Sequence, residues 1–145
     1  SDAPVVRLVN LMLAEAIQLS ATHVILTALP GAVAIQYVIN GEAVDREQTP
    51  RRMLSAIIAR LKILAKVDIS IKDQLQTGTM NITVAETTSN LQVHFAPTSE
   101  GTTVLIEFNT VAKTPIVPSE LVIAPDQPKC VRAWWEARSM QSTLQ

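Results

Sequence analysis

Three stretches of the chain alternate between apolar and polar residues. This alternation restricts the possible folds of the chain more than any other feature of the sequence. Successive side chains of a strand point to opposite faces of a sheet, so each stretch predicts a strand with one buried face. The connections at residues 86–89 and 98–101 are short, polar and typical of hairpins. We therefore expect an antiparallel sheet with one face covered by helices. The apolar positions are Met80, Ile82 and Val84, then Leu91, Val93 and Phe95, and then Val104, Ile106 and Phe108.

Two helices precede and interrupt the strands. Residues 4–19 have apolar positions at helical spacing, with Asp2 placed to cap the helix, and Leu11, Leu13 and Leu19 widen the apolar stripe. We expect this helix to be buried on more than one side. The second helix is predicted to start at Thr49-Pro50 and to end near Lys66. Its expected core face consists of Leu54, Ile57, Ile58, Leu61, Leu64 and Ala65.

Three further strands are predicted between the helices, at residues 22–27, 33–39 and 42–47. Pro30-Gly31 and Asn40-Gly41 separate them, and Asn-Gly readily adopts the positive φ angles of a tight hairpin turn. The third of these strands is polar and is expected at an edge. The fold class is thus α+β, with two helices on one face of a largely antiparallel, PAS-like sheet. The predicted order across residues 4–108 is α, β, β, β, α, β, β, β.

The composition changes past residue 110. Prolines at 115, 118, 125 and 128 punctuate the next stretch, and a short helix over about 128–140 follows, with Asp126 as its expected cap. We predict a domain at residues 1–110 and a proline-rich extension with a C-terminal helix at 111–145.

The charge balance and the single cysteine exclude several classes of protein. The net charge is −1, which provides no basic field for nucleic acid. Cys130 alone can form neither an internal disulfide nor a thiolate metal cage, and this suits a reducing, cytoplasmic location. The apolar runs are shorter than a bilayer span, so no membrane insertion is expected.

Four sequence segments carry a resemblance to a known family. They are VRLVN at 6–10, SATH at 20–23, IQYVING at 35–41 and ARLKILAKVDI at 59–69. In this order they resemble the domain that precedes the motor domain in bacterial type II secretion and type IV pilus assembly ATPases. The resemblance covers about residues 3–108, and Arg60, Lys62 and Asp68 with their spacing are its most specific part. It implies a domain that supplies arginines and polar groups to nucleotide held by a motor domain.

The chain departs from that family at the charge-bearing positions. The arginines that the family carries in the strand resembling 35–41 are Gln36 and Val38 here, and its Asp is Asn40. The family's Asp-Ile-His is replaced by residues 23–25 (HVI), and its loop PQDGR by 75–79 (LQTGT). In the later strand, 93–97 (VHFAP) replaces a segment that carries an arginine in the family. Gln and Val cannot replace an arginine fork on phosphate oxygens.

No phosphate-binding loop occurs in these 145 residues. The glycines stand at 31, 41, 78 and 101, and none of them is followed by lysine. We therefore predict that this chain has no catalytic residues, binds no cofactor or metal, and does not hydrolyse ATP alone.

Several residues have both a functional and an ordinary interpretation. His23 and His94 could form a ligand or acid–base pair, but no third ligand recurs at metal spacing, which favours a structural or solvent-facing role. Glu42, Asp45 and Glu47 could bind a cation, although charges that guard an edge strand are the commoner case. Cys130 could be a nucleophile, yet no His or Asp lies nearby in the sequence, so a small buried thiol is expected.

The possible partner contacts form two groups. Arg51, Arg52, Arg60 and Lys62 could bind phosphate or an acidic partner, or could simply form a solvated helix face. Trp134 and Trp135 could anchor a partner, because tryptophan is enriched at interface centres. Alternatively, the C-terminal helix folds back and an indole covers the domain itself, with the first helix as the expected receiving surface.

Three hypotheses of function follow. The first is a non-catalytic interaction or assembly module, whose partner is a secretion or pilus ATPase or another copy of the chain. The second is an N-terminal fragment of a complete ATPase with a downstream motor. The third is a small-molecule sensor, since a helix-on-sheet fold can hold a ligand between its layers.

Overall fold

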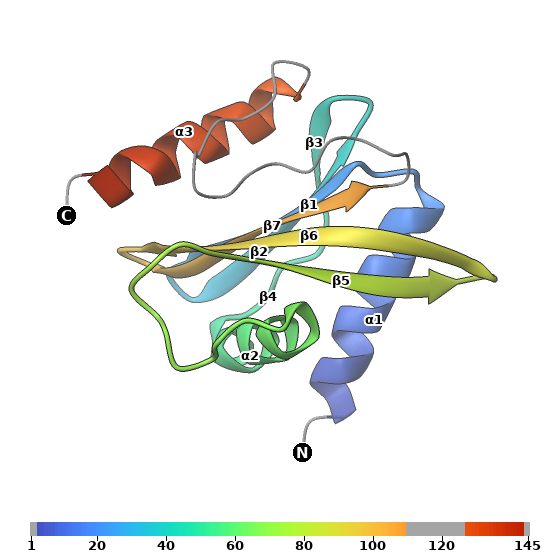
Figure 1. The fold of residues 1–145 in the computed structure, drawn as a ribbon, viewed down its shortest axis with the longest axis horizontal. Helices are drawn as coiled ribbons and strands as arrows, with labels where there is room; N and C mark the ends of the chain where they lie inside the picture. Colours follow the sequence, from blue (N-terminus) through green and yellow to red (C-terminus); the bar gives the residue numbers. More distant parts are fainter. Residues whose placement is uncertain (1–2, 110–126, 144–145) are drawn as a thin grey trace.

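The computed structural model describes residues 3–109 and 127–143, and it shows one antiparallel sheet between two helical layers (Figure 1). The helices are α1 (Ala3–Gln18), α2 (Leu54–Ala65) and α3 (Lys129–Thr143). The main strands are β1 (His23–Leu29), β2 (Ala32–Ile39), β3 (Glu42–Asp45), β5 (Gln76–Val84), β6 (Thr87–Thr98) and β7 (Gly101–Asn109). The predicted α+β class and the order of elements are confirmed.

The sheet is built from two hairpin-connected halves. Its strand order is β3-β2-β1-β7-β6-β5, so β3 and β5 form the edges. Within each half the strands pair with their neighbours along the chain. The halves join where β1 pairs with β7, for example at Val24 and Ile106. This long-range pair makes a single sheet out of the N-terminal and C-terminal halves.

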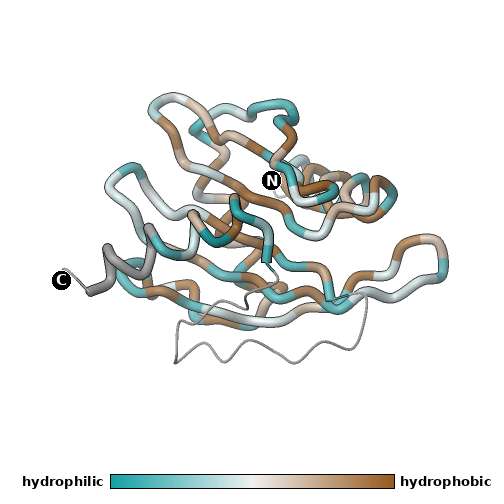
Figure 2. The backbone as a smooth tube through the Cα atoms, turned by 90° about the horizontal axis from the view of Figure 1, so that it is seen from above, coloured by the Kyte–Doolittle hydropathy of each residue, from teal (hydrophilic) through white to brown (hydrophobic). Residues whose placement is uncertain are grey.

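The main core lies between the sheet and the helices α1 and α2. Alternate residues of β1, β6 and β7 point into it, as the period of two predicts, and Phe95, Leu91 and Ile106 are almost completely buried. The predicted core residues Ile58 and Leu61 of α2 are also buried. In Figure 2 the hydrophobic colour follows the strands and helices, and hydrophilic colour gathers at several turns.

Helix α1 is buried on one side only. The prediction that Leu11, Leu13 and Leu19 are all buried was therefore wrong for two of these three residues. Leu13 is fully buried, but Leu11 is 63% exposed and Leu19 is 42% exposed. In the described residues, no second layer covers the outer side of α1. Tyr37 instead secures the inner side, because its hydroxyl donates to Met12 O at 3.2 Å and to Glu15 Oε1 at 2.8 Å.

Thr49-Pro50 does not begin the second helix. These two residues form the short strand β4 (Thr49–Pro50), which pairs with Ala32 and Val33 of β2. A residue before proline favours extended backbone, which delays the helix. The turn η1 (Arg51–Met53) follows, and α2 then ends at Lys66, whose φ of 62° gives a left-handed cap.

The hairpins are tighter than the sequence suggested. The turn between β5 and β6 consists of Ala85 and Glu86, with φ angles of 50° and 67°, so residues 87–89 belong to β6. Residues 76–78, which lie where the resembling family has its PQDGR loop, belong to β5. The Asn40-Gly41 turn is confirmed, with φ angles of 52° and 83°.

The third helix covers the face of the sheet opposite α1 and α2 (Figure 1). The predicted helix at 128–140 is therefore present, but it does not dock on α1. The predicted caps Asp2 and Asp126 and most of the proline-rich stretch lie outside the described residues. The predicted division at residue 110 stays a prediction.

Candidate interaction surfaces

A basic groove of about 600 Å³ runs along α2. Three cationic side chains line it: Arg51 from η1, Lys62 from α2 and Lys72 from the loop that follows α2. Apolar and small residues complete its wall, including Leu54, Ala56, Ala59 and Ile69. A concave surface of this composition suits an acidic and partly apolar segment of another protein.

Arg51 holds one end of this groove in place. Its guanidinium donates to Leu29 O at 2.8 Å and also to Glu100 O. These carbonyls belong to the ends of two hairpins, so Arg51 connects both hairpin ends to the start of α2. Part of its charge faces inward, which makes Arg51 a structural residue as well as a groove residue.

Lys62 is buried, which the sequence did not indicate. Only 2% of it is exposed, its Nζ donates to Ile71 O at 2.6 Å, and it lies 5.7 Å from the centre of the Phe95 ring. Burial lowers the pKa of Lys62, and the neighbouring Lys72 lowers it further, while Asp68 opposes this change. The hydrogen bond to Ile71 O fixes the position of Lys62 Nζ in the groove wall.

The other two arginines do not line the groove. Arg52 is exposed and Arg60 is half-buried. The structure thus joins Arg51 and Lys62 with Lys72, which sequence reasoning did not single out. Lys72 could be found only by knowing that the loop after α2 folds back beside the helix.

The opposite face of the sheet carries a second hydrophobic cluster. Val131, Trp134 and Trp135 of α3 pack on strand residues whose side chains point away from the main core: Ile25, Val38, Ala96 and Leu105. Trp134 is 8% exposed and Trp135 is 3% exposed. Both candidate partner residues are therefore buried against their own domain.

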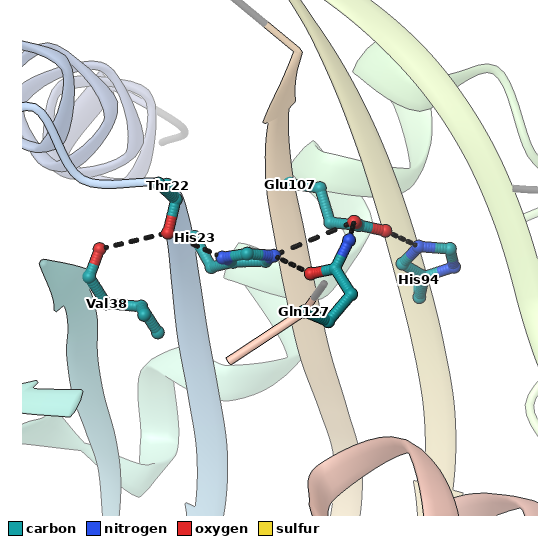
Figure 3. A network of polar contacts seen from close by, with 6 residues as sticks. All are labelled: Thr22, His23, Val38, His94, Glu107 and Gln127. Carbon is teal, nitrogen blue, oxygen red and sulfur yellow. Dashed lines mark hydrogen bonds and ion pairs between the residues drawn. The ribbon is translucent and has the colours of Figure 1, made fainter. Parts of the chain in front are cut away.

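A row of polar side chains crosses three strands beneath α3 (Figure 3). Glu107 of β7 lies between two histidines, with its Oε1 2.7 Å from His94 Nε2 and its Oε2 3.6 Å from His23 Nε2. Gln127 joins the row from the start of the α3 segment. Its Oε1 lies 2.9 Å from His23 Nε2, and its Nε2 donates to Glu107 Oε2 at 3.4 Å.

The outer ring nitrogens of the two histidines also have partners. His23 Nδ1 lies 2.8 Å from Thr22 Oγ1, and His94 Nδ1 lies 2.8 Å from Thr77 Oγ1. The edge of the Trp135 indole meets the His94 ring at 4.9 Å between centres. This network satisfies buried polar groups and orients both rings.

Opposing effects set the pKa of Glu107. Burial alone would raise the pKa, but hydrogen bonds with His23 and His94, together with electrostatic attraction to the same two rings, lower it to about 2. The carboxylate is thus ionised over the ordinary pH range. In the described residues, no group of three or more His, Cys, Asp or Glu side chains is arranged to hold a metal ion.

The remaining candidate residues lie apart from both surfaces. Glu42 and Asp45 are exposed on the edge strand β3, where Asp45 Oδ1 accepts a hydrogen bond of 2.8 Å from Gln36 Nε2. Cys130 is half-buried beside the second cluster, with its Sγ 3.9 Å from Gly41 O. Of the described residues, no helix is both long and apolar enough to cross a bilayer.

Comparison with known proteins assigns a family to most of the chain. Residues 1–132 match the family described as Type II/IV secretion system protein. Type II secretion system protein E of Xanthomonas campestris pv. campestris is 32% identical over 106 residues, which are 73% of this chain and 19% of that protein. The protein of the same name from Pectobacterium carotovorum subsp. carotovorum is 30% identical over 105 residues, 72% of this chain and 21% of that protein.

A third relative is named as an ATPase. Type II secretion system ATPase E of Vibrio cholerae serotype O1 is 28% identical over 105 residues, 72% of this chain and 21% of that protein. The chain spans about a fifth of the length of these relatives.

Proposed function

From the premise that this chain belongs to the family of type II/IV secretion system proteins, we propose that it is a non-catalytic assembly module of such a system. It acts in the cytoplasm, and it binds another protein of the system through the basic groove along α2. The partner is a secretion or pilus ATPase, or a second copy of the chain.

The face under α3 carries this proposal. In the family that this chain resembles, arginines stand at the positions of residues 36 and 38 and face nucleotide that is held by a motor domain. Here these residues are Gln36 and Val38, and Val38 is fully buried in the cluster beneath Trp134 and Trp135. A face closed by the chain's own helix and lacking an arginine fork is poorly suited to phosphate.

The groove along α2 supplies the contact surface. Its cations Arg51 and Lys62 are positioned by hydrogen bonds to backbone carbonyls. Such positioned charges lose little freedom on binding, which favours recognition of a carboxylate-rich segment. The exposed Ile69 in the same wall offers an apolar contact beside them.

A second candidate rests on the lengths of the relatives. Because the chain corresponds to about a fifth of each, it could instead be the N-terminal part of a complete secretion ATPase. In that case, a motor domain following residue 145 would bind and hydrolyse ATP. The reading frame of the encoding gene separates the two candidates.

Titration calorimetry tests the non-catalytic part of the proposal. We expect no heat of binding when Mg-ATP is added to the chain at concentrations up to the millimolar range. Micromolar affinity for Mg-ATP would overturn it. Gln36→Arg is a useful comparison, because it restores one of the two charges that the resemblance implies without altering the buried Val38.

A binding measurement tests the groove. The wild-type chain should bind the purified secretion or pilus ATPase of the same bacterium, and Lys72→Glu should weaken this complex at least about tenfold. Arg7→Glu is a matched charge reversal on the exposed surface of α1 and should have little effect. Equal weakening by both variants, or no complex at all, would contradict the proposed contact.

A further inference from the structure

The two edges of the sheet differ sharply in length and charge. β3 is four residues long and carries Glu42 and Asp45, with all four side chains exposed. β5 is nine residues long, Gln76–Val84, and contains neither a charged residue nor proline. Proteins commonly protect an edge strand by keeping it short or charged, and β5 has neither protection.

The C-terminal half of β5, from residue 79 onwards, has an open edge to which a further strand can pair. In the part of the chain that the structure describes, β6 is the only strand paired with β5. The first half of β5 is covered near Gly78, which packs against Ala65 and Val67 at the end of α2. From residue 79 onwards the side chains of Thr79, Asn81 and Thr83 are exposed.

The two faces of this half of β5 differ in polarity, as do the two faces of the sheet. Met80 is buried in the main core, and Ile82 packs against it from the side of α1 and α2. The exposed residues at 79, 81 and 83 are all Thr or Asn. A strand added here would meet apolar residues on the helical side and uncharged polar residues on the other side.

We propose that β5 is a self-association edge, on which β5 of a second copy pairs antiparallel about a two-fold axis through Asn81. This register sets Met80 opposite Ile82 on the helical side and Thr79 opposite Thr83 on the other side. Residues of like kind therefore face each other, as cross-strand pairing favours. The open residues 79–83 carry no charge, so the pairing brings no like charges together.

The uncharged sequence of β5 selects a second copy as the occupant. A self-complementary strand needs opposite or zero charge at facing positions, and a two-fold contact uses the same surface on both copies. The same pairing through β3 would bring together two short strands with two carboxylates each, which repel. This inference deepens the proposed assembly role by naming one partner, but it uses a different surface from the groove along α2.

A charge-swap experiment tests the pairing. Asn81→Lys places two lysines opposite each other at the two-fold axis, and Asn81→Asp places two aspartates there. In sedimentation velocity across micromolar to millimolar concentrations, the wild type should dimerise reversibly. Each variant should dimerise at least about tenfold more weakly, and an equimolar mixture of the two should regain the dimer. Regain on mixing would show that the variants are folded.

Ala43→Lys on the exposed edge strand β3 is the matched control and should dimerise like the wild type. Amide hydrogen exchange should also slow over residues 79–84 as the wild type becomes concentrated. A wild type that stays monomeric at millimolar concentration would overturn the proposal. So would unchanged dimerisation of both Asn81 variants, failure of the mixture to recover, or equal weakening by Ala43→Lys. None of these outcomes alters binding through the groove along α2, so the two proposals can fail separately.

Discussion

Glu107 shows how much one buried side chain can determine in this protein. Two histidines from neighbouring strands and Gln127 converge on its carboxylate, under the indole of Trp135. A buried carboxylate is costly unless it is well hydrogen-bonded. The histidines supply those bonds from buried positions, which fits the structural and not the solvent-facing of the two ordinary roles that the sequence left open. Their common partner lies 84 and 13 residues away along the chain and could not be read from spacing.

Acid should destabilise the folded protein because it protonates the Glu107 carboxylate. The pKa of Glu107 is about 2 in the folded state and near its usual 4.5 when unfolded. The contribution of Glu107 to the free energy of unfolding is therefore fully present above pH 4.5, and it is lost as the pH falls from 4.5 towards 2. At about 1.4 kcal/mol per unit, the loss amounts to roughly 3 kcal/mol. Urea unfolding at pH 7 and pH 3 measures the part of this loss that falls above pH 3, about 2 kcal/mol.

Glu107→Gln is the variant for this comparison. It removes the titrating group, so the decrease in stability between pH 7 and pH 3 should become smaller by most of that amount. An unchanged decrease would show that other carboxylates cause the acid sensitivity. Glu42→Gln, on the exposed β3 strand, should leave the decrease as it is in the wild type.

Gly78 is required for the close contact between β5 and the end of α2. A Cβ at this position would lie 2.2 Å from Ala65 O and 2.8 Å from Val67 Cγ1. Backbone cannot yield as a flexible side chain does, so Gly78→Ala should cost about 1–3 kcal/mol of unfolding free energy. Thermal or urea unfolding provides the measurement. Thr79→Ala, exposed at the next position, should cost less than about 0.5 kcal/mol.

At the scale of elements, α3 illustrates how a helix can be predicted while its position is not. The sequence indicated a helix with two tryptophans that dock on an apolar surface. It could not show which surface, because Ile25, Val38, Ala96 and Leu105 come from four separate strands. They form one patch only after the sheet is assembled. The exposed Leu11 on α1 looked equally suitable in the sequence.

Trp135→Ala should loosen α3 without changing the mass of the particle. Trp135 is almost completely buried between α3 and the sheet, and truncation of such a side chain costs about 3–5 kcal/mol in a core. The expected result is stronger acrylamide quenching of Trp134 and faster amide exchange over residues 129–136. Glu136→Ala, exposed on the same helix, is the control. Unchanged quenching in both variants would mean that Trp135 does not hold the helix.

At the scale of the whole molecule, local patterns predicted the elements but not their long-range relations. Periods of two and 3.6 residues identified the strands and helices, because each element has one buried face. The pairing of β1 with β7 joins residues far apart in sequence, and nothing local specifies it. The groove along α2 was missed in part for the same reason, since Lys72 reaches it from a loop.

The two layers should unfold at different denaturant concentrations. Both tryptophans lie in α3, so their fluorescence reports the outer layer, while far-UV circular dichroism reports mainly the sheet and the other helices. Among the described residues, three buried side chains of α3 pack on the sheet, whereas the main core draws buried side chains from seven helices and strands. Elements with few buried contacts open at lower free energy than the core. The fluorescence midpoint in urea should therefore precede the dichroism midpoint.

Leu61→Ala provides a second test, because it leaves a cavity in the main core that costs about 2–5 kcal/mol of unfolding free energy. This variant should move the dichroism midpoint towards the fluorescence midpoint. Superimposed transitions in the wild type would instead mean that the two layers unfold as one cooperative unit.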